Sequence, residues 1–204
     1  MFHMEQFNNV NEVLKMMTGI IGLPRQGKST LLAKIAKKRT KKGIKCYSNF
    51  PMKGCYKLNF NDLGKKNFHD CCILIDEISL FADCRNFKEF GDNLVYFFTN
   101  YGHFNIEIFY CTQNYDDCDK KIRCLTDELY SITSFWRFSL CRPIVKSIII
   151  DGDIKNSYIE RRIPKIIYRP FYYDMFDSYN RRELPDVDDY LWFDIENSPS
   201  SSSE

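Results

Sequence analysis

The sequence of 204 residues lacks the features of several common protein classes. It has nine cysteines but no Cys-x-x-Cys spacing, and only three histidines, so we expect no zinc site. No apolar run approaches the ~18 residues of a membrane-spanning helix, and the N-terminus lacks the apolar core of a signal peptide. The net charge of +2 is too small to indicate nucleic-acid binding by itself. These absences favour a soluble intracellular protein.

The composition that is present suits one packed domain. Hydrophobic residues make up 44% of the chain and aromatic residues 16%, which argues against disorder of the whole. The length is enough for one α/β domain and short for two. The odd number of cysteines, with Cys71 and Cys72 inside an apolar stretch, indicates the reduced thiols of a cytoplasmic protein.

The segment Gly22-Leu-Pro-Arg-Gln-Gly-Lys-Ser-Thr30 matches the phosphate-binding loop pattern G-x-x-x-x-G-K-[ST] at every fixed position. Residues 17–21 predict a buried strand before it, and residues 29–42 predict a helix after it. The glycines let backbone N–H groups surround phosphate oxygens, Lys28 reaches the β and γ phosphates, and the helix presents its positive end. We expect the nucleotide to bind these loop residues: Gly22, Arg25, Gln26, Gly27, Lys28, Ser29 and Thr30.

An acidic pair follows a second apolar run. Residues 71–75 are apolar throughout, which predicts a strand covered on both faces, as in a parallel sheet. Asp76 and Glu77 come next, at the carboxyl edge where ligands bind in α/β proteins. We expect Asp76 and the Ser29 hydroxyl to bind Mg²⁺, and Glu77 to orient and deprotonate an attacking water. The alternative is a solvated strand end.

Residues 105–111 predict a further strand that ends at Thr112-Gln113, which places Gln113 to contact the γ-phosphate. The other predicted elements are a strand over 43–50, a short strand and a short helix within 53–70, a helix over 87–101, a strand over 130–139, and a hairpin around Asp151-Gly152-Asp153 with strands 144–150 and 157–161. The basic stretch 37–42 has two open interpretations. Its cations are either solvated at a helix C-terminus or in contact with DNA phosphates.

Together with these motifs, three shorter pieces point to a family: Tyr47-Ser-Asn49, Tyr101-Gly-His-Phe104 and Ile122-Arg123. Over residues 17 to about 140 the chain resembles the ATPase domain of the zonular occludens toxin family, the assembly ATPases of filamentous phages. That family belongs to the FtsK and HerA group of ring-forming, DNA-pumping ATPases. The resemblance implies hydrolysis of ATP with Mg²⁺, and it implies adenine in preference to guanine. No Asn/Thr-Lys-x-Asp motif for reading guanine is present.

The resemblance also implies partners and a location. We expect a homo-oligomeric ring that acts on phage DNA with virion or membrane assembly proteins, in the cytoplasm of a bacterial host cell or at its inner membrane through a partner. Family members typically continue into a membrane-spanning helix, and this sequence shows none. Arg123 is the expected arginine for a neighbouring subunit's nucleotide, with Arg137 as the second candidate. The alternative for Arg123 is a surface pair with Asp127 or Glu128.

The predicted fold class is α/β, a three-layer P-loop NTPase with a mainly parallel central sheet and a C-terminal β-hairpin extension. The predicted division is a lead-in over 1–16, the ATPase domain over 17–163, an aromatic extension packing on it over 164–196, and a disordered tail over 197–204. Two other functions stay open, a small-molecule kinase and a non-hydrolysing nucleotide-dependent binding module. The Asp76-Glu77 pair and Gln113 favour water as the nucleophile, and Glu77 argues against the binding module.

Overall fold

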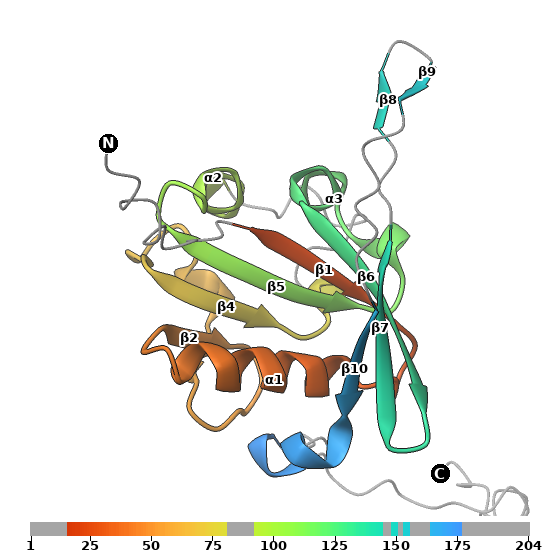
Figure 1. Ribbon diagram of the computed structural model, residues 1–204. Coiled ribbons are helices and arrows are strands. Elements are labelled where there is room, and N and C mark those ends of the chain that lie inside the picture. Colours follow the sequence, from red (N-terminus) through yellow and green to blue (C-terminus); the bar gives the residue numbers. More distant parts are fainter. Residues whose placement is uncertain (1–15, 81–91, 145–147, 151–152, 156–163, 177–204) are drawn as a thin grey trace, which may run out of the picture.

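The computed structural model describes residues 16–80, 92–144, 148–150, 153–155 and 164–176 (Figure 1). The elements, in chain order, are β1 (Met17–Ile21), α1 (Lys28–Thr40), β2 (Lys45–Ser48), β3 (Tyr56–Lys57), η1 (Phe60–Asp62), β4 (Cys71–Ile75), η2 (Ile78–Leu80), α2 (Asp92–Asn100), β5 (Ile106–Thr112), η4 (Tyr115–Asp117), α3 (Lys120–Leu125), β6 (Glu128–Phe135), β7 (Phe138–Ile144), β8 (Ile148–Ile150), β9 (Asp153–Lys155), β10 (Lys165–Tyr168) and η5 (Arg169–Met175).

One eight-stranded sheet organises these elements, in the order β10-β7-β6-β1-β5-β4-β2-β3. The strands from β6 to β3 are parallel to their neighbours, whereas β7 is antiparallel to β6 and β10 is antiparallel to β7. Parallel pairing places the carboxyl ends of β1, β4 and β5 at one edge of the sheet. The predicted α/β class with a mainly parallel sheet is confirmed.

Helices cover the sheet on two faces, α1 on one and α2 with α3 on the other (Figure 1). The packing of β4 on both faces explains why its apolar run is uninterrupted. Ile73 and Ile75 pack in the cluster that includes Phe97 of α2, while Leu74 packs in the cluster that includes Leu32 of α1. Every residue of β4 is buried, so the strand has no solvent face on which a polar residue would be favoured.

The strand predicted over 130–139 is wrong, because this segment forms most of a hairpin. β6 and β7 pair antiparallel from Leu129 with Ile144 to Phe135 with Phe138, and the chain turns at Trp136 and Arg137. Trp136 adopts a positive φ of 49°. Turns of this kind normally carry Gly, Asn or Asp, so no local pattern marks this turn.

The predicted hairpin around residues 151–153 is present as β8 and β9, which project from the sheet (Figure 1). Its second strand occupies residues 153–155, earlier than the predicted 157–161; residues 156–163 lie outside the described ones. The predicted lead-in, except for residue 16, and the predicted tail lie outside them too. β10 joins the main sheet, and η5 follows it. Within the described ranges no helix is long and apolar enough to cross a membrane.

Two of the basic residues at the end of α1 make contacts within the fold. Arg39 Nε lies 2.6 Å from Glu107 Oε2 of β5, and both side chains are largely buried. Lys37 Nζ lies 5.6 Å from the centre of the Tyr172 ring in η5. Burial raises the pKa of Glu107, and the charge of Arg39 opposes that rise. Lys38, Lys41 and Lys42 remain exposed, so the two interpretations of this stretch now concern those residues and not Arg39.

Arg39→Met should lower the free energy of unfolding at pH 7 by about 3 kcal/mol, because it leaves the Glu107 carboxylate buried without its partner. The pKa of that carboxyl would rise further in the variant, so the deficit should shrink on acidification as Glu107 takes up a proton. Urea denaturation at pH 5 and pH 7 measures both effects. Lys41→Met, an exposed lysine that is not among the charges acting on Glu107, is the matched control, and adding Glu107→Gln to Arg39→Met should recover most of the loss. Equal stability of Arg39→Met and the control would contradict the role of the pair.

Candidate nucleotide-binding site

The loop between β1 and α1 has the conformation that the phosphate-binding pattern predicts. Gly27 has a φ of 93°, a left-handed conformation that other residues adopt at a cost, and α1 begins at Lys28. Lys28 Nζ donates hydrogen bonds to the carbonyl oxygens of Gly22 and Leu23, at 2.7 and 3.2 Å. A Cβ on Gly22 would lie 2.8 Å from the Ile132 carbonyl oxygen of β6, so only glycine fits there without a backbone shift.

Ser29 and Asp76 meet at the edge of the sheet. The Ser29 hydroxyl donates to Asp76 Oδ2 at 2.7 Å, although the two residues are far apart in the sequence. Burial raises the pKa of Asp76, and the Ser29 hydrogen bond and the charge of Lys28 oppose the rise. A cation beside this carboxylate would relieve its desolvation. A carboxylate and a hydroxyl oxygen are the ligand types that Mg²⁺ prefers, so the pair fits the predicted magnesium site.

Asn49 fixes the backbone at Asp76. Its amide group donates to the Asp76 carbonyl and its amide oxygen accepts from the Asp76 N–H, both at 2.8 Å. This reciprocal pair joins the segment after β2 to the end of β4. The family resemblance includes the segment Tyr47-Ser-Asn49. The two hydrogen bonds to the Asp76 backbone are a physical reason for an asparagine at its last position.

Glu77 has a left-handed backbone, with a φ of 54°. Such a conformation costs a non-glycine residue about 1 kcal/mol or more, and strain of this kind is common at functional sites. Its carboxylate Oε1 accepts from the Ser79 hydroxyl at 2.7 Å and from the Gln113 backbone N–H at 3.4 Å. The ends of β4 and β5 are therefore joined through this carboxylate, and the exposed Gln113 lies beside it.

The other wall of the loop comes from the β6–β7 hairpin and the C-terminal segment. The Gln26 side chain accepts a hydrogen bond from the Ser134 N–H, and the Ser139 hydroxyl donates to the Gln26 carbonyl at 2.9 Å. Arg169 Nη1 donates to the Arg25 carbonyl at 3.4 Å. Ser134, Ser139 and Arg169 are residues of the candidate site that the sequence did not predict, because no local pattern marks a contact across more than a hundred residues.

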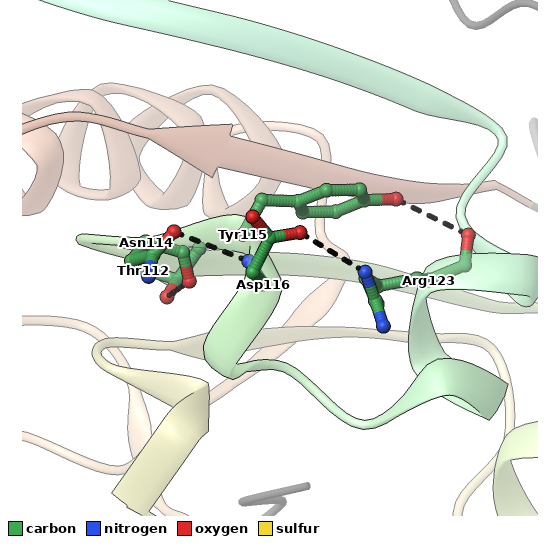
Figure 2. Close-up of polar contacts among 5 residues, drawn as sticks. All are labelled: Thr112, Asn114, Tyr115, Asp116 and Arg123. Atoms are coloured by element: carbon green, nitrogen blue, oxygen red, sulfur yellow. Dashed lines mark hydrogen bonds and ion pairs between the residues drawn. The ribbon is translucent and has the colours of Figure 1, made fainter.

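Arg123 lies in α3, in a hydrogen-bonded unit with the loop after β5 (Figure 2). Its Nη1 binds Asp116 Oδ1 at 3.1 Å, and its carbonyl accepts from the Tyr115 hydroxyl at 3.2 Å. Asn114 Oδ1 accepts from the Asp116 N–H, and the Asn114 carbonyl accepts from the Thr112 hydroxyl. The guanidinium is thus tied to the strand end from which Gln113 projects.

The predicted site residues fall into two groups. The loop residues, Asp76, Glu77 and Gln113 meet at the edge formed by β1, β4 and β5, and Thr30 is buried in the first turn of α1. Arg123 lies on α3, on the opposite face of the sheet from α1 (Figure 1). Its predicted action on a neighbouring subunit stays a prediction, as does that of the second candidate, Arg137, at the turn of the β6–β7 hairpin.

No family model and no curated protein matches the chain. Solved structures that share its fold include the N-terminal domain of zonular occludens toxin from Neisseria meningitidis, with a TM-score of 0.53 and 15% identity over 79% of this chain and 99% of that one. They also include the genome packaging NTPase B204 from Sulfolobus turreted icosahedral virus 2 in complex with sulfate, with a TM-score of 0.51 and 11% identity over 74% and 95% of the two chains. At these identities the likeness establishes the fold, which confirms the predicted P-loop NTPase architecture.

Asp76→Asn should raise the melting temperature of the ligand-free protein at pH 7 by a few degrees, since about 1 kcal/mol corresponds to roughly 2–4 °C in a domain of this size. An amide keeps an acceptor for Ser29 without a buried charge. The pKa of Asp76 is raised in the fold, so its ionisation destabilises the wild type as pH rises through that pKa. The advantage of the variant should therefore vanish on the acid side.

Melting curves between pH 3.5 and pH 8 measure this, with the exposed Asp174→Asn as control. A variant that melts below the wild type at neutral pH would show that the Asp76 carboxylate stabilises the ligand-free fold.

Proposed function

We propose that this chain is an ATP-hydrolysing motor that moves phage DNA during packaging or extrusion. The observation that carries the nucleotide part is the convergence of Lys28, the Ser29–Asp76 pair and Glu77 at one edge of a parallel sheet. Ligands bind at this edge in α/β folds, and these side chains match the charge distribution of a nucleoside triphosphate with its divalent cation.

The hydrogen-bond partners of Lys28 in the ligand-free protein support the proposal that it binds a triphosphate. Its ammonium group is bound to two neutral carbonyl oxygens and the residue is only 8% exposed. A buried cation is more stable beside an anion than beside neutral acceptors, so phosphate oxygens are better partners for it. Gly27 and the N-terminus of α1 supply backbone N–H groups for the same phosphates. Arg25, Gln26 and Thr30 belong to the loop that surrounds them.

Ser29 and Asp76 are the residues that would hold Mg²⁺. The ion, when bound, neutralises charge that develops on the phosphates during hydrolysis. Asp76 is held for this role by Asn49, and its carboxylate is already aimed at Ser29. We therefore expect the Asp76 carboxylate to move little when the site is loaded.

Glu77 is the proposed general base. The Ser79 hydroxyl holds one oxygen of the Glu77 carboxylate at 2.7 Å, with the Gln113 N–H at 3.4 Å from the same oxygen, which leaves the other oxygen to accept a proton from water. A binding module needs no base, so this arrangement disfavours that alternative. Against a kinase, the adjacent Asp76-Glu77 pair and Gln113 favour water over a substrate hydroxyl as the nucleophile. Gln113, on the neighbouring strand end, is placed to sense the γ-phosphate.

Arg123 is the proposed arginine for a neighbouring subunit. The chain from Thr112 through Asn114 and Asp116 to its guanidinium links it to the strand end that carries Gln113 (Figure 2). A change at Gln113 on loss of the γ-phosphate would move Arg123 relative to the next subunit. The remaining parts of the proposal rest on the motif resemblance, because one fold serves many functions. These parts are the ring, the DNA substrate, the virion or membrane assembly partners and the cytoplasmic site of action.

Two substitutions separate binding from chemistry. Lys28→Ala should abolish measurable ATP binding by calorimetry, because it removes the cation that faces the phosphates. Glu77→Gln should bind ATP normally and release phosphate roughly 10²–10⁴-fold more slowly, because an amide cannot accept the proton. Lys38→Ala, an exposed lysine on the same helix, is the control and should match the wild type in both assays.

Wild-type affinity in Lys28→Ala would remove the loop from nucleotide binding. Wild-type turnover in Glu77→Gln would show that this carboxylate is not the base.

A further inference from the structure

Arg169 is a cation that lies against the phosphate-binding loop. Its Nη1 donates to the Arg25 carbonyl and its Nη2 to the Trp136 carbonyl, both of which are neutral. Its Nε is buried without a hydrogen-bond acceptor. None of the ion pairs among the described residues involves Arg169. The guanidinium therefore meets no opposite charge in this part of the chain, although such a group is strongly stabilised by one.

The segments around Arg169 carry more basic residues than acidic ones. The β6–β7 hairpin, β10 and η5 together contain four basic residues, Arg137, Arg142, Lys165 and Arg169, and two acids, Glu128 at the start of β6 and Asp174 near the end of η5. A half-buried guanidinium without an ion-pair partner among the described residues is stabilised when an anion binds beside it. The loop beside it has the pattern for binding a polyanion.

The main chain holds Arg169 in place. Its N–H donates to the Arg137 carbonyl at 2.9 Å, directly after the β10–β7 ladder ends. Ile167, two residues earlier, is 1% exposed in the cluster under α1, and Tyr172 packs against the same cluster. A side chain with an anchored backbone loses less conformational entropy when it binds a ligand, so the position is prepared for one.

We infer that Arg169 binds a phosphate of the nucleotide held by the Gly22–Thr30 loop of its own chain. The inference rests on the proposed function and names a residue that the loop motif does not contain. Arg169 Cδ lies 3.3 Å from the place that a Cβ on Gly27 would occupy, so the side chain runs along the loop where α1 begins. The 3.4 Å bond to Arg25 is long, and a phosphate oxygen is the stronger acceptor for the same donor.

The inference gives the C-terminal segment a role in the site. β10 and η5 would carry a cation to the phosphates from the side opposite Asp76, since β6 and β7 separate β10 from β1, whereas β4 lies beyond β5. Arg169 would act on its own chain's nucleotide, in contrast to the action across a subunit boundary proposed for Arg123. Because Arg169 also donates to the Trp136 carbonyl, a shift of its side chain on nucleotide binding would change the contact at the tip of the β6–β7 hairpin.

Calorimetric titration of the full chain with ATP and with inorganic tripolyphosphate tests this inference. Arg169→Ala should weaken the binding of both roughly ten- to a hundredfold, the scale of one lost charge-assisted contact. Arg169→Lys keeps the charge and should recover part of the affinity, whereas Arg169→Gln keeps hydrogen-bond donors for the two carbonyls and should not. Arg142→Ala, an exposed arginine on β7, is the matched control and should bind like the wild type.

The outcomes are distinguishable. ATP affinity in Arg169→Ala equal to that of the control would overturn the inference and leave the proposed function standing. An equal loss in Arg169→Lys and Arg169→Ala, with lowered melting temperatures in both, would also overturn it by showing a purely structural role. A wild type that binds neither ATP nor tripolyphosphate would overturn the proposed function, and the inference with it.

Discussion

The carboxyl group of Asp76 and its hydrogen bond to Ser29 form the contact on which the site depends. The contact joins the end of the central strand β4 to the first turn of α1, and Asn49 adds the end of β2 through the Asp76 backbone. Burial makes the ionised carboxyl costly, so the fold keeps a destabilising charge at the point where a cation would remove it. The site is in this sense prepared for a ligand at the expense of the ligand-free protein.

A second set of contacts ties the loop to later parts of the chain. Ser134 and Ser139 of the β6–β7 hairpin bind Gln26, and Arg169 of η5 binds Arg25. These contacts require that β6, β7 and β10 extend the sheet beyond β1 with the observed register. The hairpin and the C-terminal segment are therefore structural parts of the candidate site, whatever else they contact.

Local sequence predicted the parts of the site that local chemistry determines. The loop was predictable because glycine at position 27 takes a left-handed conformation that other residues adopt only at a cost, and because lysine and serine at a fixed spacing are the pattern that binds phosphate. β4 was predictable because a strand covered by helices on both faces needs an uninterrupted apolar run. Asp76 and Glu77 follow that strand directly, so the prediction of β4 also predicted that they lie at the sheet edge.

The rest depends on long-range pairing that leaves no local signal. The turn at Trp136 and Arg137 lacks the glycine or asparagine that marks most hairpins, so one predicted strand proved to be most of a hairpin. Arg169 reaches the loop only because β10 pairs with β7, and nothing in residues 164–173 indicates that partner. The contact of Arg123 with Asp116 likewise arises from the loop geometry shown in Figure 2.

Phosphate release from ATP by the wild-type chain with Mg²⁺, measured alone and with single-stranded and double-stranded DNA, tests the central claim most directly. The expected result is slow hydrolysis by the protein alone and faster hydrolysis with DNA, with Glu77 as the proposed base and Ser29 and Asp76 as the proposed Mg²⁺ ligands. No phosphate release under any of the three conditions, from protein that calorimetry shows to bind ATP, would contradict it.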